Sequence, residues 1–219
     1  MTCPPGCICQ GLAFTCSNIF NTSFYPELRY LNAGGSLLQP LQLSQNVLVI
    51  LLNLTKCQLL RTTMHIPSLP NLLILDLSWN LIDFINMDSF GVLTNLDSLL
   101  LSNNPITLFT SETDFSNKKI TSVDLSSTRL KVLQTRALTC CQNLRNINLR
   151  NTPIQSIQQS VFFTNSLIEV LDFRFDSDIV HSPNDLLIGL RNLDEVKTTD
   201  FRLCCPVMLP KGFNYNNCR

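Results

Sequence analysis

The chain has very little of what catalysis and cofactor binding require. It holds only two histidines, His65 and His181, and neither belongs to an H-E-x-x-H or nucleophile motif. Phosphate-binding loops of the G-x-G-x-x-G or G-K-[ST] type are absent from the sequence. Carboxylates that come in pairs, such as Asp83 and Asp88, fall at expected turns as ordinary solvated residues. We therefore expect a protein that is not an enzyme, with no catalytic residue, no metal and no cofactor.

Charge and long apolar runs are also scarce. Charged residues make up 15% of the chain and the formal net charge is zero, so we expect neither a nucleic-acid partner nor an anionic-membrane surface. The longest apolar run, Val47 to Leu52, is too short to span a bilayer, and any membrane anchor would have to lie outside this chain. Because Met1 and Thr2 lead directly into Cys3, we interpret Met1 as a start codon added to a mature or excised segment.

Leucine, by contrast, is abundant and regularly spaced. The stretch from Leu72 to Ile82 reads L-x-x-L-x-L-x-x-N-x-I. Leu75 and Leu77 alternate with other residues, which predicts a short strand with one buried face and one wet face. Asn80 falls where the chain turns away from this strand. An amide there can bond backbone groups of neighbouring turns that would otherwise be buried and unpaired.

The same frame recurs every 24 residues, and we call the asparagine position of each unit the ladder position. The ladder positions hold Asn80, Asn104, Thr128, Thr152 and Asp176, with Cys57 and Ser36 in two less regular units upstream. Such a period predicts stacked units that share one elongated core. We count about eight units, the last beginning near Leu193.

This pattern resembles the leucine-rich repeat (LRR) family. The resemblance implies an α/β solenoid, a horseshoe with a parallel β-sheet on its concave face and disulfide caps at both ends. We expect an N-terminal cysteine cap over 1–27, about seven repeats over 28–192, and a last strand with a C-terminal cap over 193–219. From Phe109 to Lys119 the offset shifts, so that Phe115, not Asp114, is the expected core residue. Further core residues are expected on the convex side, at Ile85, Phe90, Leu133, Leu138, Ile157 and Phe162.

Ten cysteines, most of them in two terminal clusters, indicate an oxidising compartment. Near the start, four of them form the pattern C-x3-C-x-C-x6-C. This pattern resembles the N-terminal cap of extracellular LRR proteins, including the variable lymphocyte receptors of jawless fish, and the resemblance implies the pairs Cys3–Cys9 and Cys7–Cys16. The alternative is a zinc site, although zinc sites favour two separated C-x2-C pairs.

The C-terminal cluster holds Cys204, Cys205 and Cys218. Adjacent cysteines after a last strand resemble the C-terminal cap of LRR-containing G-protein-coupled receptors, the group of the glycoprotein-hormone and relaxin receptors. We expect Cys205–Cys218, or Cys204–Cys218, with the remaining cysteine bonded outside this chain.

Three cysteines lie within the repeats. Cys57, at a ladder position, and Cys141, at the place of the leucine in an earlier repeat, are expected to be buried. We expect Cys140 to be exposed, as an inert thiol or as a site of intermolecular pairing. Two N-glycosylation sequons occur, at Asn21 and Asn53. A glycan on Asn53 would lie on the concave face and direct ligands toward later repeats.

The variable strand positions form columns across the expected concave face. The column between the two central leucines reads Asn32, Asn53, Asp76, Leu100, Asp124, Asn148, Asp172 and Lys197. The column two residues on reads Gly34, Thr55, Ser78, Ser102, Ser126, Arg150, Arg174 and Thr199. The candidate ligand-binding residues are Asp76, Trp79, Asp124, Arg150, Asp172, Arg174 and Phe175. The alternative is that Asp and Ser only keep an exposed sheet soluble and that Trp79 packs on its neighbours. As a site, an acidic row would suit a basic peptide.

These observations predict an extracellular recognition module, secreted or on the cell surface, that binds a protein, a peptide or a microbial glycan. The N-terminal cap and the short stack favour an immune receptor of the variable-lymphocyte-receptor or Toll-like kind. The C-terminal cap favours the hormone-binding or peptide-binding ectodomain of an LRR-containing G-protein-coupled receptor. An adhesive or matrix protein is a further alternative. A homodimer through Cys140 or the sheet face is also possible.

Overall fold

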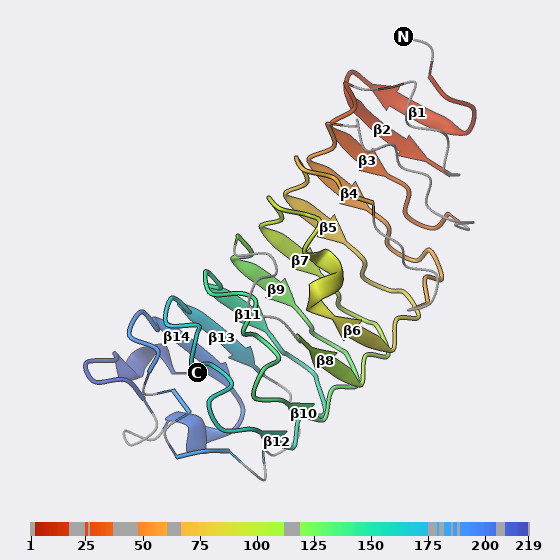
Figure 1. The fold of residues 1–219 in the computed structure, drawn as a ribbon. Coiled ribbons are helices and arrows are strands. Elements are labelled where there is room, and N and C mark those ends of the chain that lie inside the picture. Colours follow the sequence, from red (N-terminus) through yellow and green to blue (C-terminus); the bar gives the residue numbers. More distant parts are fainter. Residues whose placement is uncertain are drawn as a thin grey trace.

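The computed structural model describes residues 3–17, 25, 27–36, 48–60, 67–111, 119–174, 179, 182–184, 186–187, 189–204 and 209–218. The chain forms an elongated stack of similar turns, and its two ends lie at opposite ends of the stack (Figure 1). Each turn contributes one short strand to a common sheet, so the repeats predicted from the 24-residue period share a single continuous sheet.

Ten strands form the main sheet. In sheet order they are β1 (Cys7–Gln10), β2 (Ala13–Cys16), β3 (Tyr30–Asn32), β4 (Leu51–Asn53), β5 (Ile74–Asp76), β7 (Ser98–Leu100), β9 (Ser122–Asp124), β11 (Asn146–Asn148), β13 (Val170–Phe173) and β14 (Glu195–Thr198). Strands β1 and β2 are antiparallel and all later neighbours are parallel. The outer face of this sheet, which we call the sheet face, is the predicted concave surface.

The strands are in register, so the same repeat position lies side by side in successive turns. Leu75 lies beside Leu99, and the row of central strand residues continues through Val123 and Ile147, all fully buried. The residues on either side of this row are only partly buried, which gives each strand one inward and one outward face. A single row of inward side chains therefore forms the sheet side of the core.

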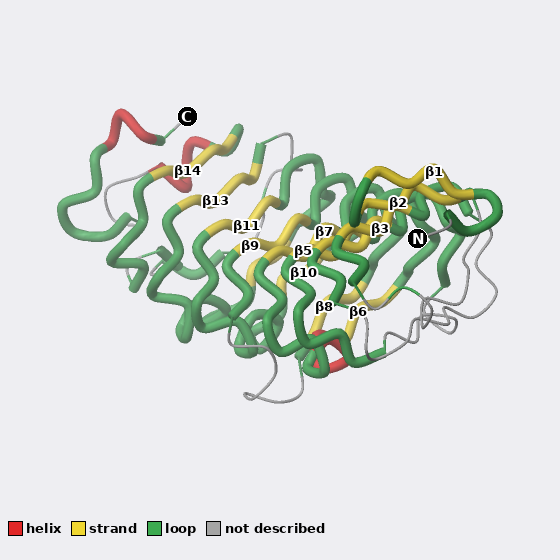
Figure 2. Tube along the Cα trace, turned by 90° about the horizontal axis from the view of Figure 1, so that it is seen from above, coloured by secondary structure: helices red, strands yellow, loops and turns green. Residues whose placement is uncertain are grey.

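Two small sheets lie on the opposite side of the stack from the main sheet (Figure 2). They pair β6 (Phe84–Asn86) with β8 (Leu108–Thr110) and β10 (Val132–Leu133) with β12 (Ser156–Ile157). Among the described residues there are also three 3-10 helices: η3 (Met87–Phe90), η4 (Phe201–Cys204) and η5 (Tyr215–Asn217). The repeat solenoid is thus confirmed, but within the described ranges its return segments hold short strands and 3-10 turns where an α/β solenoid would hold α-helices. Strand pairing satisfies backbone groups that a helix would otherwise satisfy.

The predicted convex core is confirmed. The residues that were expected to be buried there, Ile85, Phe90, Leu133, Leu138, Ile157 and Phe162, all are. Phe109 is buried as well, whereas Asp114 and Phe115 lie outside the described residues. Cys57 and Cys141 are buried, as expected. The expectation of an exposed Cys140 is wrong, because its side chain turns inward and is 0% exposed.

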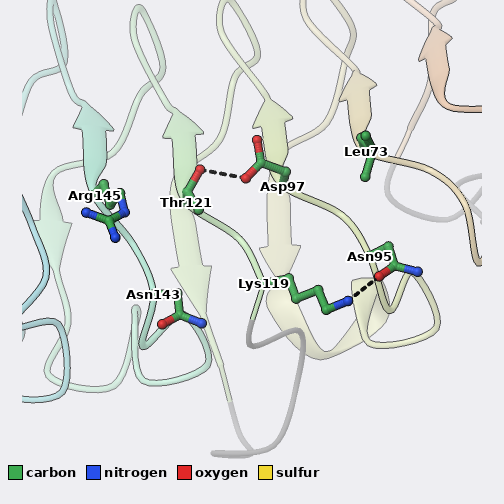
Figure 3. A pocket seen from close by; sticks show the side chains of 7 residues that line it. All are labelled: Leu73, Asn95, Asp97, Lys119, Thr121, Asn143 and Arg145. Carbon is green, nitrogen blue, oxygen red and sulfur yellow. Dashed lines mark hydrogen bonds between the residues drawn. The ribbon is translucent and has the colours of Figure 1, made fainter.

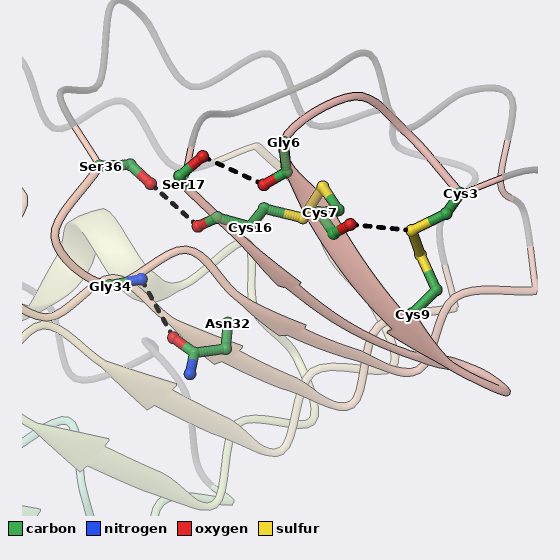
Figure 4. The surroundings of a disulfide bond; sticks show 9 residues. All are labelled: Cys3, Gly6, Cys7, Cys9, Cys16, Ser17, Asn32, Gly34 and Ser36. Atoms are coloured by element: carbon green, nitrogen blue, oxygen red, sulfur yellow. Dashed lines mark hydrogen bonds between the residues drawn. A yellow bond between two sulfur atoms is a disulfide. The ribbon is translucent and has the colours of Figure 1, made fainter.

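The N-terminal end of the core is covered by the β1–β2 hairpin (Figure 4). Cys3 is bonded to Cys9 and Cys7 to Cys16, which are the pairs that the cap resemblance implies. The hydroxyl of Ser36, the first ladder residue, donates to the Cys16 carbonyl at 3.3 Å and ties the hairpin to the first repeat. The hairpin therefore continues the sheet while its disulfides hold it closed.

At the other end, Cys204 of η4 forms a disulfide bond with Cys218. The backbone of Cys218 also forms an isolated parallel β-bridge with Val196 of β14. The first of our two alternatives, Cys205–Cys218, is therefore wrong; Cys205 itself lies outside the described residues. The domain boundaries at 27/28 and 192/193 stay predictions.

Candidate ligand-binding face

The side chains of the acidic column on the sheet face accept hydrogen bonds from the backbone of their own repeats. Asp76 Oδ1 accepts a hydrogen bond from the Ser78 backbone N–H at 2.9 Å, and Asp124 Oδ1 accepts one from Ser126 at 2.8 Å. The same bond, from the N–H two residues on, is made by the side chains of Asn32, Asn53, Asn148 and Asp172. This is the Asx turn, in which a short polar side chain ends the strand. The sequence signal for this turn was the Asp or Asn that recurs at this position of the repeats.

The structure brings two predicted ligand residues, Asp172 and Arg174, into contact with each other. Arg174 Nε donates to Asp172 Oδ1 at 3.0 Å and Nη2 donates to Oδ2 at 2.6 Å, which is bidentate geometry. The hydrogen bonds to Asp172 raise the pKa of Arg174 above its usual value. A ligand therefore meets a pair whose charges largely cancel, in place of an isolated cation and an isolated anion.

One backbone position repeats in a left-handed conformation, directly before each of the six described ladder residues. The φ values there are +79° at Gly35, +57° at Lys56, +60° at Trp79, +56° at Asn103, +56° at Ser127 and +58° at Asn151. Glycine and asparagine tolerate this region, whereas a bulky side chain in it is an outlier. Tryptophan is thus the least suited of the six residues to its backbone.

Trp79 is also among the exposed large hydrophobic residues, with 56% of its surface accessible. Lys56, at the equivalent position one repeat earlier, places its Nζ 5.5 Å from the ring centroid, within cation–π range. Leu81, two residues on, is 51% exposed. Sequence reasoning identified Trp79 but missed Lys56 and Leu81, since their neighbourhood depends on how two repeats align.

The remaining predicted residues are spread along the sheet. Asp76 and Trp79 belong to the β5 repeat, whereas Asp172 and Arg174 belong to the β13 repeat, four strands away and about 19 Å at the usual strand spacing. Arg150 is exposed between these two groups. Phe175 shares the column of Trp79 but lies outside the described residues, as does the sequon residue Asn21. The predicted residues are thus spread along the sheet face and do not line one pocket.

A groove that the sequence did not predict runs along the entry ends of the strands (Figure 3). Its volume is about 420 Å³ and it is lined by Leu73, Asn95, Asp97, Lys119, Thr121, Asn143 and Arg145. Its polar side chains bind one another across repeats: Thr121 donates to Asp97 at 2.7 Å, and Lys119 donates to Asn95. The groove is assembled from two columns with a 24-residue spacing, so it becomes visible only once the strand register is known.

A second aspartate–arginine pair lies near the C-terminal end of the described chain. Asp200 accepts from Arg202 Nε at 2.8 Å and from Nη2 at 2.6 Å, and these bonds lower the pKa of Asp200. Among the described residues, no group of three or more His, Cys, Asp or Glu side chains is arranged to hold a metal ion. In the same part of the chain, no helix has the length and apolarity needed to cross a membrane.

The fold and its disulfide-closed ends define a capped LRR solenoid. A model of the family described as "BspA type Leucine rich repeat region" matches residues 71–182 in six copies. This chain belongs to that family. No curated protein matches the sequence.

Solved structures share the fold at low sequence identity. TLR13, in its complex with the single-stranded RNA ssRNA13, matches with a TM-score of 0.62 and 19% identity over 83% of this chain and 31% of that one. A chain in the octameric complex of Latrophilin 3, Unc5D and FLRT2, where FLRT2 is the LRR component, matches with a TM-score of 0.69 and 17% identity over 90% of this chain and 64% of that one. This chain thus spans about a third of the first and under two thirds of the second.

These likenesses bear on two of the sequence expectations. The expectation that nucleic acid is not a partner finds no support, because one structure of this fold is a complex with RNA. The specific cap resemblances, to lymphocyte receptors at one end and to G-protein-coupled receptors at the other, stay predictions.

Proposed function

We propose that this chain is an extracellular recognition module of an immune-type LRR receptor, and that it binds a protein partner on the sheet face around Trp79. Disulfides near both ends support an oxidising, extracellular location. The solenoid offers a long, regular face with residues that vary from repeat to repeat, which suits recognition of a large partner.

The observation that carries this proposal is the backbone of Trp79. A tryptophan at a φ of +60° is strained, and strain of this kind persists where function requires it. Its ring is more than half exposed, so burial in the core of this chain does not offset the strain. Tryptophan is the type of residue that most often dominates protein interfaces.

The surroundings of Trp79 indicate what the partner presents there. Lys56 lies over the ring and Leu81 adds apolar surface beside it. An apolar side chain with a carboxylate close to it would cover Leu81 and Trp79 and pair with Lys56. Further along the sheet, Arg150 and the Asp172–Arg174 pair would provide a second, polar contact region.

The test is a substitution that separates strain from binding, Trp79→Asn. Asparagine occupies the equivalent positions 103 and 151, where it tolerates a positive φ. We expect the variant to unfold with a free energy about 0.5–1 kcal/mol higher than the wild type, since it removes a backbone mismatch. We expect its affinity for the protein partner to fall at least about tenfold, as for a hot-spot residue.

The binding measurement uses an array of extracellular protein domains, with purified bacterial cell-wall glycan and single-stranded RNA as separate probes. The matched control is Phe163→Asn, because Phe163 is 84% exposed and lies outside the sheet strands. The proposal requires binding to a protein domain that Trp79→Asn weakens and Phe163→Asn leaves unchanged. Binding to glycan or RNA alone, or protein binding that is indifferent to Trp79, would contradict it.

The C-terminal cap keeps one alternative function open, the ectodomain of a hormone-binding G-protein-coupled receptor. The Cys204–Cys218 bond, which starts from η4 shortly after β14, is the feature that supports it. Binding of peptide hormones but of no folded domain on the same array would favour this alternative.

A further inference from the structure

Two adjacent cysteines face each other inside the convex side of the stack. Cys140 and Cys141 follow β10, and their sulfur atoms lie 2.6 Å apart. This separation is shorter than a normal N–H···O hydrogen bond although sulfur is the larger atom. It exceeds a covalent S–S bond of 2.03–2.05 Å by only about half an ångström. Both side chains are 0% exposed.

Cys140 points inward against the pattern of the repeats. Two repeats earlier, the equivalent positions hold Val92 and Leu93, and there only the second residue is buried. Val92 is 45% exposed, as expected for a side chain on the outer side of the turn. In the Cys140–Cys141 turn both residues point into the core, which brings the second sulfur to the first.

The backbone around the cysteines is held from the next repeat. Asn165 is fully buried, and its Nδ2 donates to the Leu138 carbonyl at 3.1 Å and to the Cys141 carbonyl at 2.7 Å. Within the turn, the Cys141 N–H donates to the Leu138 carbonyl at 3.0 Å. These three bonds hold the carbonyls of Leu138 and Cys141, and so they fix the backbone of the turn in which the two sulfurs lie together.

We propose that Cys140 and Cys141 form an intramolecular disulfide with each other when the protein folds in an oxidising compartment. The bond forms by exchange with a disulfide oxidant: one thiolate attacks the oxidant, and the second thiolate displaces it from the mixed disulfide. The two cysteine thiols lose two protons and two electrons in total. The oxidant gains them, and its own S–S bond becomes two thiols.

The exchange takes place before the turn closes. In the folded chain both sulfurs are inaccessible, and the neighbouring Cys140 thiol together with burial raises the pKa of Cys141 well above that of an ordinary thiol. A thiol in that state does not attack an external disulfide. The pairing also replaces both alternatives that the sequence offered for Cys140, an inert surface thiol and an intermolecular bond, since a buried sulfur cannot reach a second chain.

Peptide mapping tests this directly, because Arg136 and Arg145 flank the pair. Trypsin releases residues 137–145, which hold Cys140 and Cys141 and no other cysteine. The secreted protein is unfolded without reductant in the presence of iodoacetamide and then digested. We expect peptide 137–145 to carry no alkyl group and to weigh two hydrogens less than its reduced form.

The same digest contains its own controls. Residues 57–61 form a tryptic peptide whose only cysteine is the buried thiol of Cys57, and we expect it to carry one alkyl group. The bonded pairs Cys3–Cys9, Cys7–Cys16 and Cys204–Cys218 report that the compartment was oxidising. If these pairs are intact while peptide 137–145 carries two alkyl groups, or is linked to another peptide, the proposal is wrong.

A variant adds a second measurement. Cys140→Val introduces the residue found at the equivalent position 92, and it leaves Cys141 without its neighbour. We expect peptide 137–145 of this variant to carry one alkyl group. No alkyl group on the variant peptide would mean that Cys141 is bonded elsewhere, which contradicts the proposal.

Discussion

The ladder residues of the β5 and β7 repeats differ from the ladder residue of the β9 repeat in the hydrogen bonds that their side chains make. Asn80 Oδ1 accepts from the backbone N–H groups of Cys57 and Leu59 at 2.8 and 3.1 Å. Its Nδ2 donates to Leu54 in the preceding repeat at 2.9 Å and to Leu77 in its own repeat at 2.8 Å. One amide thus joins two consecutive turns of the solenoid.

Asn104 repeats this arrangement, since it accepts from Ile82 and donates to Leu77 and Leu101. Two repeats after Asn80, the ladder position holds Thr128. Its Oγ1 is buried and has no hydrogen-bond partner in the described part of the chain. The amide satisfies buried backbone groups in two repeats, whereas this hydroxyl is itself a buried polar group left unsatisfied.

The difference shows that the repeat period specifies where a ladder residue lies but not whether it links its neighbours. The core is equally well buried in both regions, since the central strand residues Leu75, Leu99 and Val123 are all at most 1% exposed. Coupling between turns in a solenoid depends on such interface bonds as well as on the core. We therefore infer that the β5 and β7 repeats are coupled to their neighbours more strongly than the β9 repeat.

The largest expected effect comes from Asn80→Ala. It leaves the buried N–H groups of Cys57 and Leu59 without an acceptor, so we expect the free energy of unfolding to fall by about 3 kcal/mol. Denaturant unfolding measures this loss. Thr128→Ala is the control, because it removes a hydroxyl that has no partner in the described chain and should cost about 1 kcal/mol or less. Equal losses in both variants would contradict the proposed difference.

A smaller effect, opposite in sign, is expected from Thr128→Asn, which introduces the longer amide into the β9 repeat. By analogy with Asn104, the new side chain should accept from Ile106 and donate to Leu101 and Leu125. We expect a gain of about 1 kcal/mol, the usual net value of a hydrogen bond in a folded protein. Slower hydrogen exchange at the Ile106 amide would identify the bond. Unchanged exchange there, or a loss of stability, would mean that the site does not accept an amide.

Much of the fold was predictable from the period alone. Leu75, Asn80 and their 24-residue equivalents recur because one buried strand and one turn are built the same way each time. The convex core, including Phe90, was predictable from the same offsets. The α-helical part of the expected α/β solenoid was not borne out in the described segments, since short paired strands such as β6 and β8 satisfy the backbone there.

The candidate site was predictable only in part. Trp79 stands out in the sequence by its type, but its positive φ appears only in the structure. The strand-entry groove and the Lys56–Trp79 contact come from residues of different repeats, so strand register had to be known first. The turn that holds Cys140 accepts hydrogen bonds from Asn165 in the following repeat, and nothing in the local sequence indicates that interaction.

The smallest effects, and the sharpest comparison, come from replacing each ladder threonine by valine. Thr128→Val exchanges an unpartnered hydroxyl for a methyl group, so we expect a gain of about 0.5–1 kcal/mol. Thr152 Oγ1 instead donates to the Leu149 carbonyl at 2.7 Å, and Thr152→Val removes that bond. We expect a loss of about 1 kcal/mol there. Both substitutions replace a hydroxyl by a methyl group at equivalent, buried positions, so their steric effects should be similar. A difference in sign between the two changes in the free energy of unfolding, measured by denaturant, would therefore reflect the hydrogen bond. Losses of equal size at both positions would contradict this expectation, because they would mean that the Thr128 hydroxyl also makes a hydrogen bond in the folded protein.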